Sequence, residues 1–271
     1  MIINNKLLEE SFSYKHNLQG SDLKECIISI DEIYLYVSKV EERLYFDIEC
    51  IFMQEIKEGI SLADWLWGSS YDGDKEVKDM LVQILTKPMG KEYSIFDDNI
   101  EICLYPDGSH VSTLEQYVAQ RRGILSKIAD KGEFCSFMPS CFADSVFSVQ
   151  IKNGLNQISD FSVHTEEIVK NLSVLNDEAL DIYRENRSNL RVAYKILTSK
   201  LLECSPDPEN VKHLRFEFIN DMGDIEIVEC SPHTKLVRED SNLRIYFYWC
   251  HDNIGSGNKV LIGRIGTHPY R

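Results

Sequence analysis

The sequence predicts an α+β protein built from two domains. Residues 1–160 mix helix-like and strand-like patterns, whereas residues 161–271 read as two helices followed by four strands. Apolar and polar residues alternate over 243–249, which is typical of a half-buried strand. Apolar residues recur at helical spacing over 180–201, upstream of that strand. We therefore expect the second domain to be a pair of helices packed on a four-stranded antiparallel sheet.

The elements of the first domain are predicted from local patterns. Segments 27–37 and 43–53 are rich in β-forming residues and predict an antiparallel hairpin. Segment 59–70 predicts a short helix or turn, with Trp65 and Trp67 in the core. The remaining elements are a helix over 75–86 that Pro88 and Gly90 end, a strand over 99–105, a helix over 113–130 with Thr113 as its N-cap, and an apolar stretch over 134–150 that fits strand or loop.

The second domain begins with helices and ends with strands. A helix over 165–175 opens with Thr165 and an acidic first turn. A longer helix over 177–204 follows and ends at two prolines. Strands are predicted over 213–219, 225–230, 243–249 and 259–267, in an antiparallel meander. Gly263 and Gly266 interrupt the last strand, which indicates a bulge or a close approach of another backbone segment.

Alternation along these strands predicts one apolar and one polar face. The apolar face covers the helices and is formed by Leu214, Phe216, Phe218, Ile225, Ile227, Leu243, Ile245 and Phe247. The polar face is formed by Arg215, Glu217, Glu226, Arg244, Tyr246, Tyr248, Arg264 and His268. A sheet with helices on one side leaves its second face open. The polar face is therefore the expected location of a site.

Composition is that of an ordinary globular protein and excludes some classes. Hydrophobic residues make up 43% and charged residues 27% of the 271 residues. No apolar run is long enough for a membrane span, and the N-terminal residues lack the apolar core of a secretory signal. The eight cysteines are dispersed without a CxxC pair, which favours reduced thiols in a cytoplasmic protein over a disulfide framework. We expect neither a structural metal nor a cofactor.

The net charge of −15 is distributed unevenly along the chain. Residues 1–150 contain 14 basic and 26 acidic residues, a balance of −12, and residues 151–271 contain 15 and 18, a balance of −3. From Lys212 onward there are 8 of each sign, and four of the seven histidines lie there. The acidic half repels nucleic acid, whereas the C-terminal part is compatible with binding a phosphate. Drift in surface composition is the other explanation of the asymmetry.

Searches for established catalytic motifs find none. The sequence has no GxxxxGK[ST], no GxGxxG after a strand, no GxSxG and no HExxH. Asp224, Glu226 and Glu229 precede Lys235 in a loose likeness to metal-dependent nucleases, but the acidic-x-lysine ending is absent. Any chemistry therefore has to be argued from the C-terminal strands.

Two C-terminal segments resemble a known family. The runs LRIYFYW over 243–249 and VLIGRIGTH over 260–268 resemble the end of the RelE/HigB superfamily of ribosome-dependent mRNA-cleaving toxins. The shared features are an Arg-Ile-aromatic-aromatic strand, a return strand rich in Val and Ile, and a histidine near the C-terminus, as in the HigB branch. The resemblance covers about the last hundred residues and implies two helices on a small antiparallel sheet. Members are small and basic, whereas this chain is long and acidic.

The resemblance and the chemistry of RNA cleavage give roles to particular residues. Metal-free cleavage needs a base, an acid and cations that stabilise the phosphorane. His268, Arg244 and Lys235 are the catalytic candidates, because histidine titrates near neutral pH and arginine holds a phosphate with two donors. The substrate-binding candidates are Arg238, Arg264, Tyr246, Tyr248 and His233, the tyrosines through base stacking. The alternatives are ion pairs with nearby glutamates, solvated loop charges and ordinary cross-strand aromatic pairs.

The resemblance implies a metal-independent endoribonuclease that acts in a toxin–antitoxin or antiphage-defence system. Its substrate would be mRNA at the ribosome, and the acidic domain, residues 1–160, would restrain it. The alternative is a non-catalytic component of such a system, in which the toxin-like sheet is a scaffold that binds or regulates a protein partner. The acidic domain is a candidate surface for a protein partner, and no membrane partner is expected.

Overall fold

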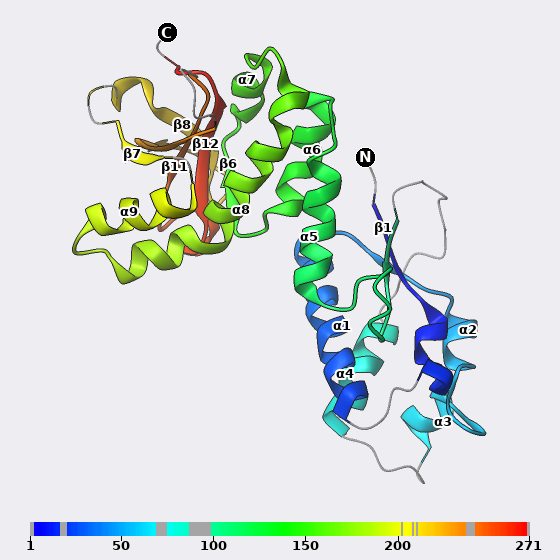
Figure 1. The fold of residues 1–271 in the computed structure, drawn as a ribbon. Helices are drawn as coiled ribbons and strands as arrows, with labels where there is room; N and C mark the ends of the chain where they lie inside the picture. Colours follow the sequence, from blue (N-terminus) through cyan, green and yellow to red (C-terminus); the bar gives the residue numbers. More distant parts are fainter. Residues whose placement is uncertain are drawn as a thin grey trace. The chain divides into compact units, whose positions relative to one another are not determined.

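The structure of the chain is a computed structural model that describes residues 3–16, 21–68, 75–86, 99–201, 203–207, 209, 211–236 and 242–269. The chain divides into two compact units, residues 1–121 and 122–271. Each unit combines helices with strands, so the protein is of the mixed α+β class that the sequence predicts (Figure 1). We expected the second domain to begin at residue 161, whereas the second compact unit begins at Arg122.

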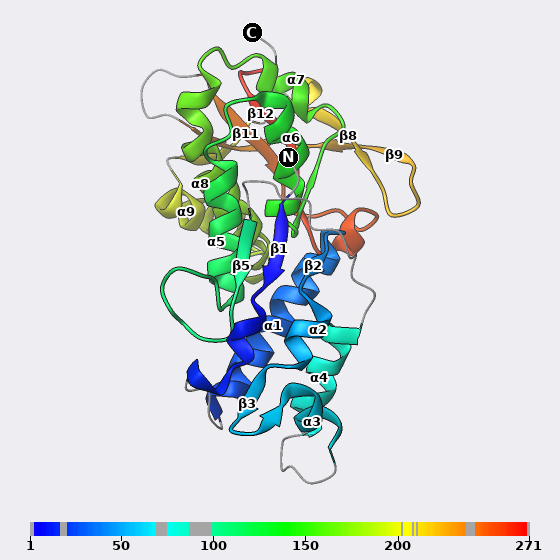
Figure 2. The same cartoon turned by 90° about the vertical axis from the view of Figure 1, so that its right-hand side faces the viewer.

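The first unit is built on a three-stranded parallel sheet. β1 (Asn4–Leu7) lies in the middle and pairs in parallel with β2 (Leu44–Tyr45) and β5 (Asn99–Ile102). Figure 2 shows β5 and β2 on either side of β1. The helices are α1 (Ser21–Lys39), α2 (Ile48–Phe52), α3 (Leu62–Trp67), α4 (Lys75–Thr86) and α5 (Leu114–Leu125); the remaining elements are the 3-10 turns Glu9–Phe12 and Tyr14–His16 and the hairpin of β3 (Glu55–Lys57) with β4 (Ile60–Ser61).

The hairpin predicted over 27–37 and 43–53 is wrong, because residues 27–37 belong to helix α1. Ile27, Ile30 and Ile33 are fully buried and Val37 is nearly so. Their spacing of three and four residues places them on one face of a helix. The β-branched composition that suggested strands therefore reflects burial of this face. In the second segment only β2 is a strand, and α2 follows it.

The other predicted elements of the first unit are present in the structure. The helix over 75–86 is confirmed as α4. The helix predicted over 113–130 is present as α5 and ends at Leu125, and the Thr113 hydroxyl accepts the Gln116 N–H at 3.2 Å. The short helix is α3, but Trp67 is exposed, so its predicted core position is wrong. Pro88 and Gly90, predicted to end α4, lie outside the described residues.

A buried ion pair connects α5 to the segment before β2. The side chain of Arg121 is fully buried, and its two terminal nitrogens donate to the Glu42 carboxylate at 2.6 and 2.7 Å. Arg121 also donates to the Tyr117 hydroxyl at 2.9 Å, and that hydroxyl donates to Asn5 at 2.7 Å. The network therefore joins α5, β1 and the end of the α1–β2 connection.

The second unit is built on a five-stranded sheet. Its order is β6 (Ser145–Phe147), β12 (Val260–Gly266), β11 (Arg244–Tyr248), β10 (Pro232–Lys235) and β7 (Cys204–Pro206). β6 pairs with β12 in parallel, and the other pairings are antiparallel. The helices are α6 (Lys131–Cys141), α7 (Ile151–Asn156), α8 (Phe161–Glu185) and α9 (Leu190–Lys200), with 3-10 turns at Val211–His213 and Gly255–Gly257. The apolar stretch over 134–150 therefore supplies part of a helix and the edge strand β6.

The predicted four-stranded meander is wrong in one pairing. β8 (Arg215–Ile219) and β9 (Ile225–Glu229) form the expected hairpin, but this hairpin is separate from the five-stranded sheet. Its inner residues Phe216, Phe218 and Val228 are buried. These apolar side chains favour folding over a sheet face rather than extending the sheet. The hairpin of β11 with β12 is confirmed.

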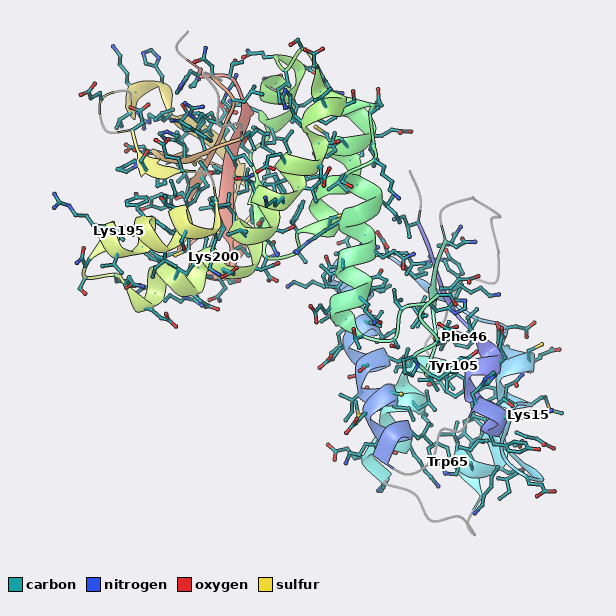
Figure 3. All side chains as sticks on the ribbon, viewed as in Figure 1. Lys15, Phe46, Trp65, Tyr105, Lys195 and Lys200 are labelled. Carbon is teal, nitrogen blue, oxygen red and sulfur yellow. The ribbon has the colours of Figure 1, made fainter. Side chains whose placement is uncertain are left out.

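The helices of the second unit divide at a different point from the one predicted. α8 continues through Asn176, whose side-chain oxygen accepts the Ser145 hydroxyl at 3.0 Å. The break falls at 186–189, where the Asn186 amide donates to the Ile182 carbonyl at 2.8 Å and competes with the helical backbone. α9 then packs against α8, and Figure 3 shows Lys195 of α9 pointing away from the unit.

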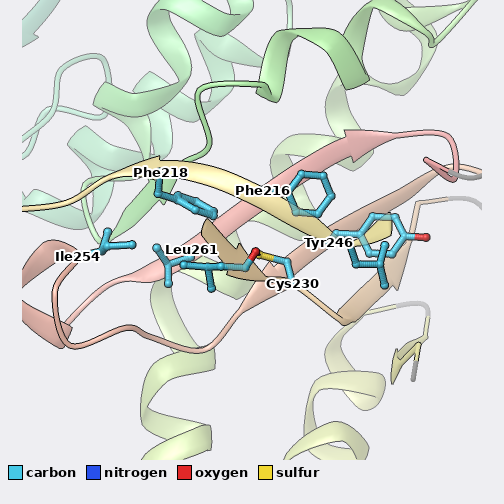
Figure 4. Close-up of a cluster of buried hydrophobic side chains, with 8 residues drawn as sticks. Phe216, Phe218, Cys230, Tyr246, Ile254 and Leu261 are labelled. Carbon is cyan, nitrogen blue, oxygen red and sulfur yellow. The ribbon is translucent and has the colours of Figure 1, made fainter. Parts of the chain in front are cut away.

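Both faces of the sheet are covered around β11. On the helix side, Ile245 and Phe247 are fully buried, and the Trp249 ring stacks on Tyr183 of α8 at 5.2 Å. On the other side, hairpin β8–β9 places apolar side chains over the sheet (Figure 4). The members of this buried cluster are Leu214, Phe216, Phe218, Val228, Cys230, Tyr246, Ile254 and Leu261. The open polar face predicted for this sheet is therefore wrong, as is the helix-facing position of Ile225 and Ile227, which are 62% and 54% exposed.

The two glycines of β12 have the roles predicted for them. Gly263 is the extra residue of a bulge, because Tyr246 pairs with Arg264 and Phe247 pairs with Ile262. A Cβ at Gly263 would lie 2.4 Å from the ring of Phe216. A Cβ at Gly266 would lie 2.4 Å from the carbonyl oxygen of Gly154 in α7. The bulge and the close backbone approach are thus confirmed.

Candidate functional site

Three candidate residues meet across neighbouring strands of the second unit. His233 of β10 pairs with Tyr246 of β11, and Tyr246 pairs with Arg264 of β12. Directly paired residues project from the same face of a sheet. The ring centroids of His233 and Tyr246 are 5.3 Å apart. We call His233, Tyr246, Arg264 and His268 the C-terminal polar cluster.

His268 joins this cluster from the segment that follows β12. A hydrogen bond of 2.5 Å joins its Nδ1 to the hydroxyl of Tyr246. Tyr246 is fully buried, so it orients the imidazole whichever of the two partners donates the proton. The rings of His268 and His233 are 6.5 Å apart. With Nδ1 engaged by the tyrosine, proton exchange with a substrate falls to Nε2.

His233 is the second imidazole of the cluster and is partly buried. Burial lowers the pKa of His233, and the positive charge of Arg244 lowers it further. The imidazole is therefore neutral near pH 7 and offers one donor and one acceptor nitrogen. Two histidines with different surroundings thus lie next to the Tyr246 ring and next to each other.

Arg264 brings a buried positive charge to the same end of the sheet. Its side chain is 8% exposed, and its Nε donates to the Thr267 carbonyl at 2.8 Å. Its Nη2 donates to Gln157 Oε1 at 2.5 Å. Neither acceptor is charged, and burial lowers the pKa of Arg264. The charge is therefore not neutralised by a carboxylate of the described residues, and it attracts an anion.

Arg244 and Lys235 face each other across β11 and β10. Arg244 is 8% exposed, and its Nη1 donates to the Leu243 carbonyl at 2.9 Å. Lys235 forms an ion pair with Glu203 beside β7. The alternative weighed for Lys235 was a solvated loop charge, whereas in the structure its ammonium group is paired with a carboxylate. Arg238 lies outside the described residues.

The tyrosines do not provide a platform for stacking bases. Tyr246 is fully buried, and its ring neighbours those of His233, His268 and Phe216. Tyr248 is half-buried against the apolar cluster, and burial raises its pKa. Stacking on an RNA base needs an accessible ring face. The predicted stacking role is therefore wrong for Tyr246, which instead holds His268.

Two polar neighbours of the cluster were missed from the sequence. Gln157 follows α7 and accepts from both Arg264 and the Thr267 hydroxyl. The hydroxyl contact measures 2.7 Å and spans 110 residues. A single glutamine outside any motif carries no signal for such a distant partner. Only the parallel pairing of β6 with β12 brings this segment to the end of the sheet.

The C-terminal polar cluster does not include a set of metal ligands among the described residues. Among the described residues, one group of His, Cys, Asp and Glu side chains could hold a metal ion, and that group lies in the first unit. None of the eight cysteines, all of which are described, forms a disulfide. Within the described ranges, no helix is both long and apolar enough to cross a membrane.

Comparisons with known proteins find no match, so any role has to be argued from the structure. The chain matches no protein-family model, and searches of curated proteins and of solved structures find no similar protein. The cluster combines a tyrosine-held imidazole, a second neutral imidazole and the buried guanidinium group of Arg264, and the buried Arg244 outside the cluster is close enough to lower the pKa of His233. Such groups can transfer protons and bind a phosphate without a metal.

Proposed function

We propose that the second unit is a metal-independent endoribonuclease of the RelE/HigB type. The observation that supports this is the hydrogen bond between His268 and Tyr246, because it orients an imidazole beside buried positive charges. The two helices followed by a sheet with a C-terminal hairpin agree with the architecture that the resemblance implies. The five-stranded order and the separate hairpin β8–β9 are departures from a simple four-stranded sheet.

In this proposal His268 is the general base. Its Nε2 accepts the proton of an RNA 2′-hydroxyl, and the 2′-oxygen attacks the adjacent phosphorus. The bond from phosphorus to the 5′-oxygen breaks, and solvent supplies the proton to that leaving oxygen, while the neutral His233 imidazole donates its ring N–H to the substrate phosphate. Arg244 and Arg264 stabilise the charge that develops on the phosphorane. Lys235 contributes only when the substrate phosphate replaces Glu203 as its partner.

Cleavage assays on single-residue variants test this proposal. The full chain is incubated with RNA alone in the presence of a chelator, and in a second arm with RNA and ribosomes in the Mg²⁺ that intact ribosomes require. Loss of a general base lowers the rate by roughly 100-fold or more, so His268→Ala should abolish most of the cleavage. Tyr246→Phe retains the ring and removes the hydroxyl, and it should reduce the rate by a smaller factor. His164→Ala changes a histidine of α8 outside the cluster and is the matched control.

Two outcomes would end the ribonuclease proposal. One is cleavage that is unchanged in His268→Ala. The other is the absence of RNA cleavage by the unmodified chain, whether or not ribosomes are present. In the second case the scaffold alternative becomes the better account of the fold.

We further propose that the first unit restrains the second through charge. Residues 1–121 contain 11 basic and 23 acidic residues, a balance of −12, and residues 122–271 contain 18 and 21, a balance of −3. Carboxylates and RNA phosphates compete for the same cations. Exposed ion pairs are screened beyond about 8–10 Å at physiological salt. Restraint of this kind should therefore weaken as salt is added.

The restraint is tested with the full chain and with residues 122–271, at low and moderate salt. The isolated unit should bind RNA more tightly at low salt, and the difference should shrink at moderate salt. A piece that begins at residue 161 is a poor reagent, because it lacks β6 and Gln157. Equal RNA binding by both chains at low salt would show that the acidic unit exerts no restraint.

One observation favours the alternative function, a non-catalytic scaffold that binds a protein. Four large apolar side chains of hairpin β8–β9 and its turn are exposed, and they are Ile219, Met222, Ile225 and Ile227. Exposed apolar groups of this kind mark interaction surfaces. If the chain is such a scaffold, replacing Ile225 and Ile227 by Thr should abolish binding of the protein partner. The measurement is partner binding, and RNA cleavage by His268 variants plays no part in it. Retained partner binding by that double variant would remove this candidate.

A further inference from the structure

The loop that follows β5 lies at a distinctive place in the first unit. The strand order β2-β1-β5 means that the chain leaves β1 to one side to form β2 and later crosses to the other side to form β5. In parallel sheets, ligands bind at the carboxyl ends of the strands where such connections diverge. Those ends are Leu7 of β1 and Ile102 of β5, which are register partners. The residue after Ile102 is Cys103.

The loop folds back on itself over residues 103–111. The Cys103 N–H donates to the Val111 carbonyl at 3.0 Å, and the Val111 N–H donates to the Glu101 carbonyl at 3.1 Å. Gly108 has a φ of 80°, which favours glycine, and it reverses the chain in the middle of the loop. The loop therefore brings its two ends and its acidic turn together.

Three ligand types converge in this loop. Cys103 offers a sulfur, Asp107 a carboxylate oxygen and His110 a ring nitrogen, and these three atoms lie within 4.8 Å of one another. Cys103 is fully buried, and burial raises the pKa of its thiol to about 11. Its Sγ donates to the Tyr105 carbonyl at 2.8 Å. The sulfur thus points into the loop rather than into the apolar core.

His110 is oriented by a carboxylate outside the trio. Its Nε2 lies 3.0 Å from Glu101 Oε2, and its Nδ1 contacts the Asp107 carboxylate. Metal-binding histidines in proteins commonly donate one ring N–H to a carboxylate, which fixes the tautomer and directs the other nitrogen to the metal. Glu101 is on β5 and is therefore held by the sheet. Nδ1 is the nitrogen directed towards Asp107.

We propose that Cys103, Asp107 and His110 bind one Zn²⁺ ion. Zinc accepts sulfur, nitrogen and oxygen ligands together, whereas Mg²⁺ and Ca²⁺ require oxygen ligands. Three protein ligands leave the fourth tetrahedral position to water or a substrate, which is the arrangement of reactive rather than purely structural zinc sites. The position at the carboxyl edge of a parallel sheet agrees with a site that receives a ligand.

This site was missed in the sequence because the spacing of its ligands is unusual. The expectation of no metal rested on the absence of paired cysteines, whereas the ligands here follow a Cys-x3-Asp-x2-His pattern with a single cysteine. The metal-free explanation of the same geometry is an ion pair of His110 with Glu101 and Asp107, beside an unrelated thiol. The experiment has to separate these two explanations.

Cobalt is the probe, because it replaces zinc and reports thiolate ligation by charge-transfer absorption in the near ultraviolet. Untagged full chain is stripped with a chelator, kept reduced and titrated with Co²⁺ and then Zn²⁺. We expect one metal per chain, a thiolate absorption band with Co²⁺, and loss of that band when Zn²⁺ is added. Elemental analysis of the zinc-loaded protein gives the stoichiometry independently.

Variants identify the ligands. Cys103→Ser should remove the thiolate band, and the matched control Cys50→Ser, at an exposed cysteine of α2, should retain it. His110 is partly exposed, so the fold should tolerate His110→Asn more readily than a change at the buried Cys103. His110→Asn should weaken Zn²⁺ binding more than Glu101→Gln does. Loss of an orienting carboxylate costs about 10-fold to 100-fold in affinity, which is the range expected for Glu101→Gln.

The result that overturns the proposal is equally specific. If the stripped chain binds neither Co²⁺ nor Zn²⁺, the residues form an ion pair and no metal site. The same conclusion follows if His110→Asn binds Zn²⁺ with unchanged affinity, or if the thiolate band persists in Cys103→Ser. None of these outcomes depends on RNA cleavage, so they leave the proposed ribonuclease activity to its own test.

Discussion

The two units assemble their polar clusters in opposite ways. In the first unit the candidate ligands all lie within the loop 103–110. In the second unit the C-terminal polar cluster is assembled by strand pairing between residues 233 and 268. A local cluster depends on one turn, whereas a cluster assembled by a sheet depends on the register of every strand between its members. Damage to the second sheet should therefore abolish cleavage and leave metal binding intact.

The largest effect is expected from ending the chain at residue 240. This removes β11 and β12, which lie inside the five-stranded sheet, and with them the buried Ile245, Phe247 and Trp249. Each of these side chains contributes roughly 1.5–3 kcal/mol by burial, so the second unit should not fold. The first unit should retain a cooperative thermal transition and Zn²⁺ binding. A melt identical to that of the full chain would contradict the assignment of these strands.

A large effect in the first unit is expected from Glu42→Gln. Arg121 is fully buried and its main charged partner is Glu42, at 2.6 and 2.7 Å. Removing one partner of a buried ion pair leaves the other charge uncompensated and costs about 3–5 kcal/mol. Chemical denaturation should show that loss in the first unit. Glu41→Gln, at an exposed neighbour, is the control and should change stability little; equal effects of both variants would show that the pair contributes nothing.

An intermediate effect in the second unit is expected from Gly263→Ala. The added Cβ would meet the Phe216 ring at 2.4 Å and Cys230 Sγ at 2.9 Å. Overpacking of this kind costs about 1–3 kcal/mol, and it should shift the bulge that aligns Arg264 with Tyr246. Gly123→Ala in α5 has open space around it and is the control. The predicted damage is absent if Gly263→Ala unfolds at the same denaturant concentration as the parent chain.

The smallest effect is a dependence of stability on pH that arises from His233. Its folded pKa is below the ordinary value of 6.5, mainly because it is buried. The unfolded chain therefore binds more protons in the interval between the two pKa values, so stability is full above pH 6.5 and declines as the pH falls below it. Denaturation curves at several pH values should show a weaker decline for His233→Gln than for His164→Gln. Parallel declines in the two variants would contradict the assignment.

The elements that the sequence predicts well are those with a strong local period. The C-terminal hairpin was predicted from the alternation along 243–249, and α4 from apolar residues at helical spacing. α1 was misread because Ile27, Ile30 and Ile33 suggest a strand by composition while their spacing is helical. The spacing of apolar residues is therefore a better guide to secondary structure than residue composition where the two conflict. Short strands such as β6, with three residues, carry no periodic signal at all.

The candidate sites were predictable to different extents. Strand alternation placed Tyr246 and Arg264 on one face, and the structure brings them together with His233 of β10, a strand that the sequence did not predict. Burial of Tyr246 was not predictable, because it depends on hairpin β8–β9 folding over the sheet rather than joining it. The partnership of Arg264 with Gln157 depends on contacts across 107 residues. Local sequence patterns show which residue types are available. They do not show which distant strands and side chains come into contact.

The parallel pairing of β6 with β12 has a consequence for biosynthesis. The Ser148 hydroxyl after β6 donates to the Gly263 carbonyl at 2.6 Å, across 115 residues of chain. At roughly 5–20 residues per second, β12 is therefore translated about 6–23 s after β6. During that interval the nascent chain carries an apolar strand whose only sheet partner has not yet been made. Chaperone capture on translating ribosomes should therefore begin when β6 emerges and end once β12 is available to pair with it.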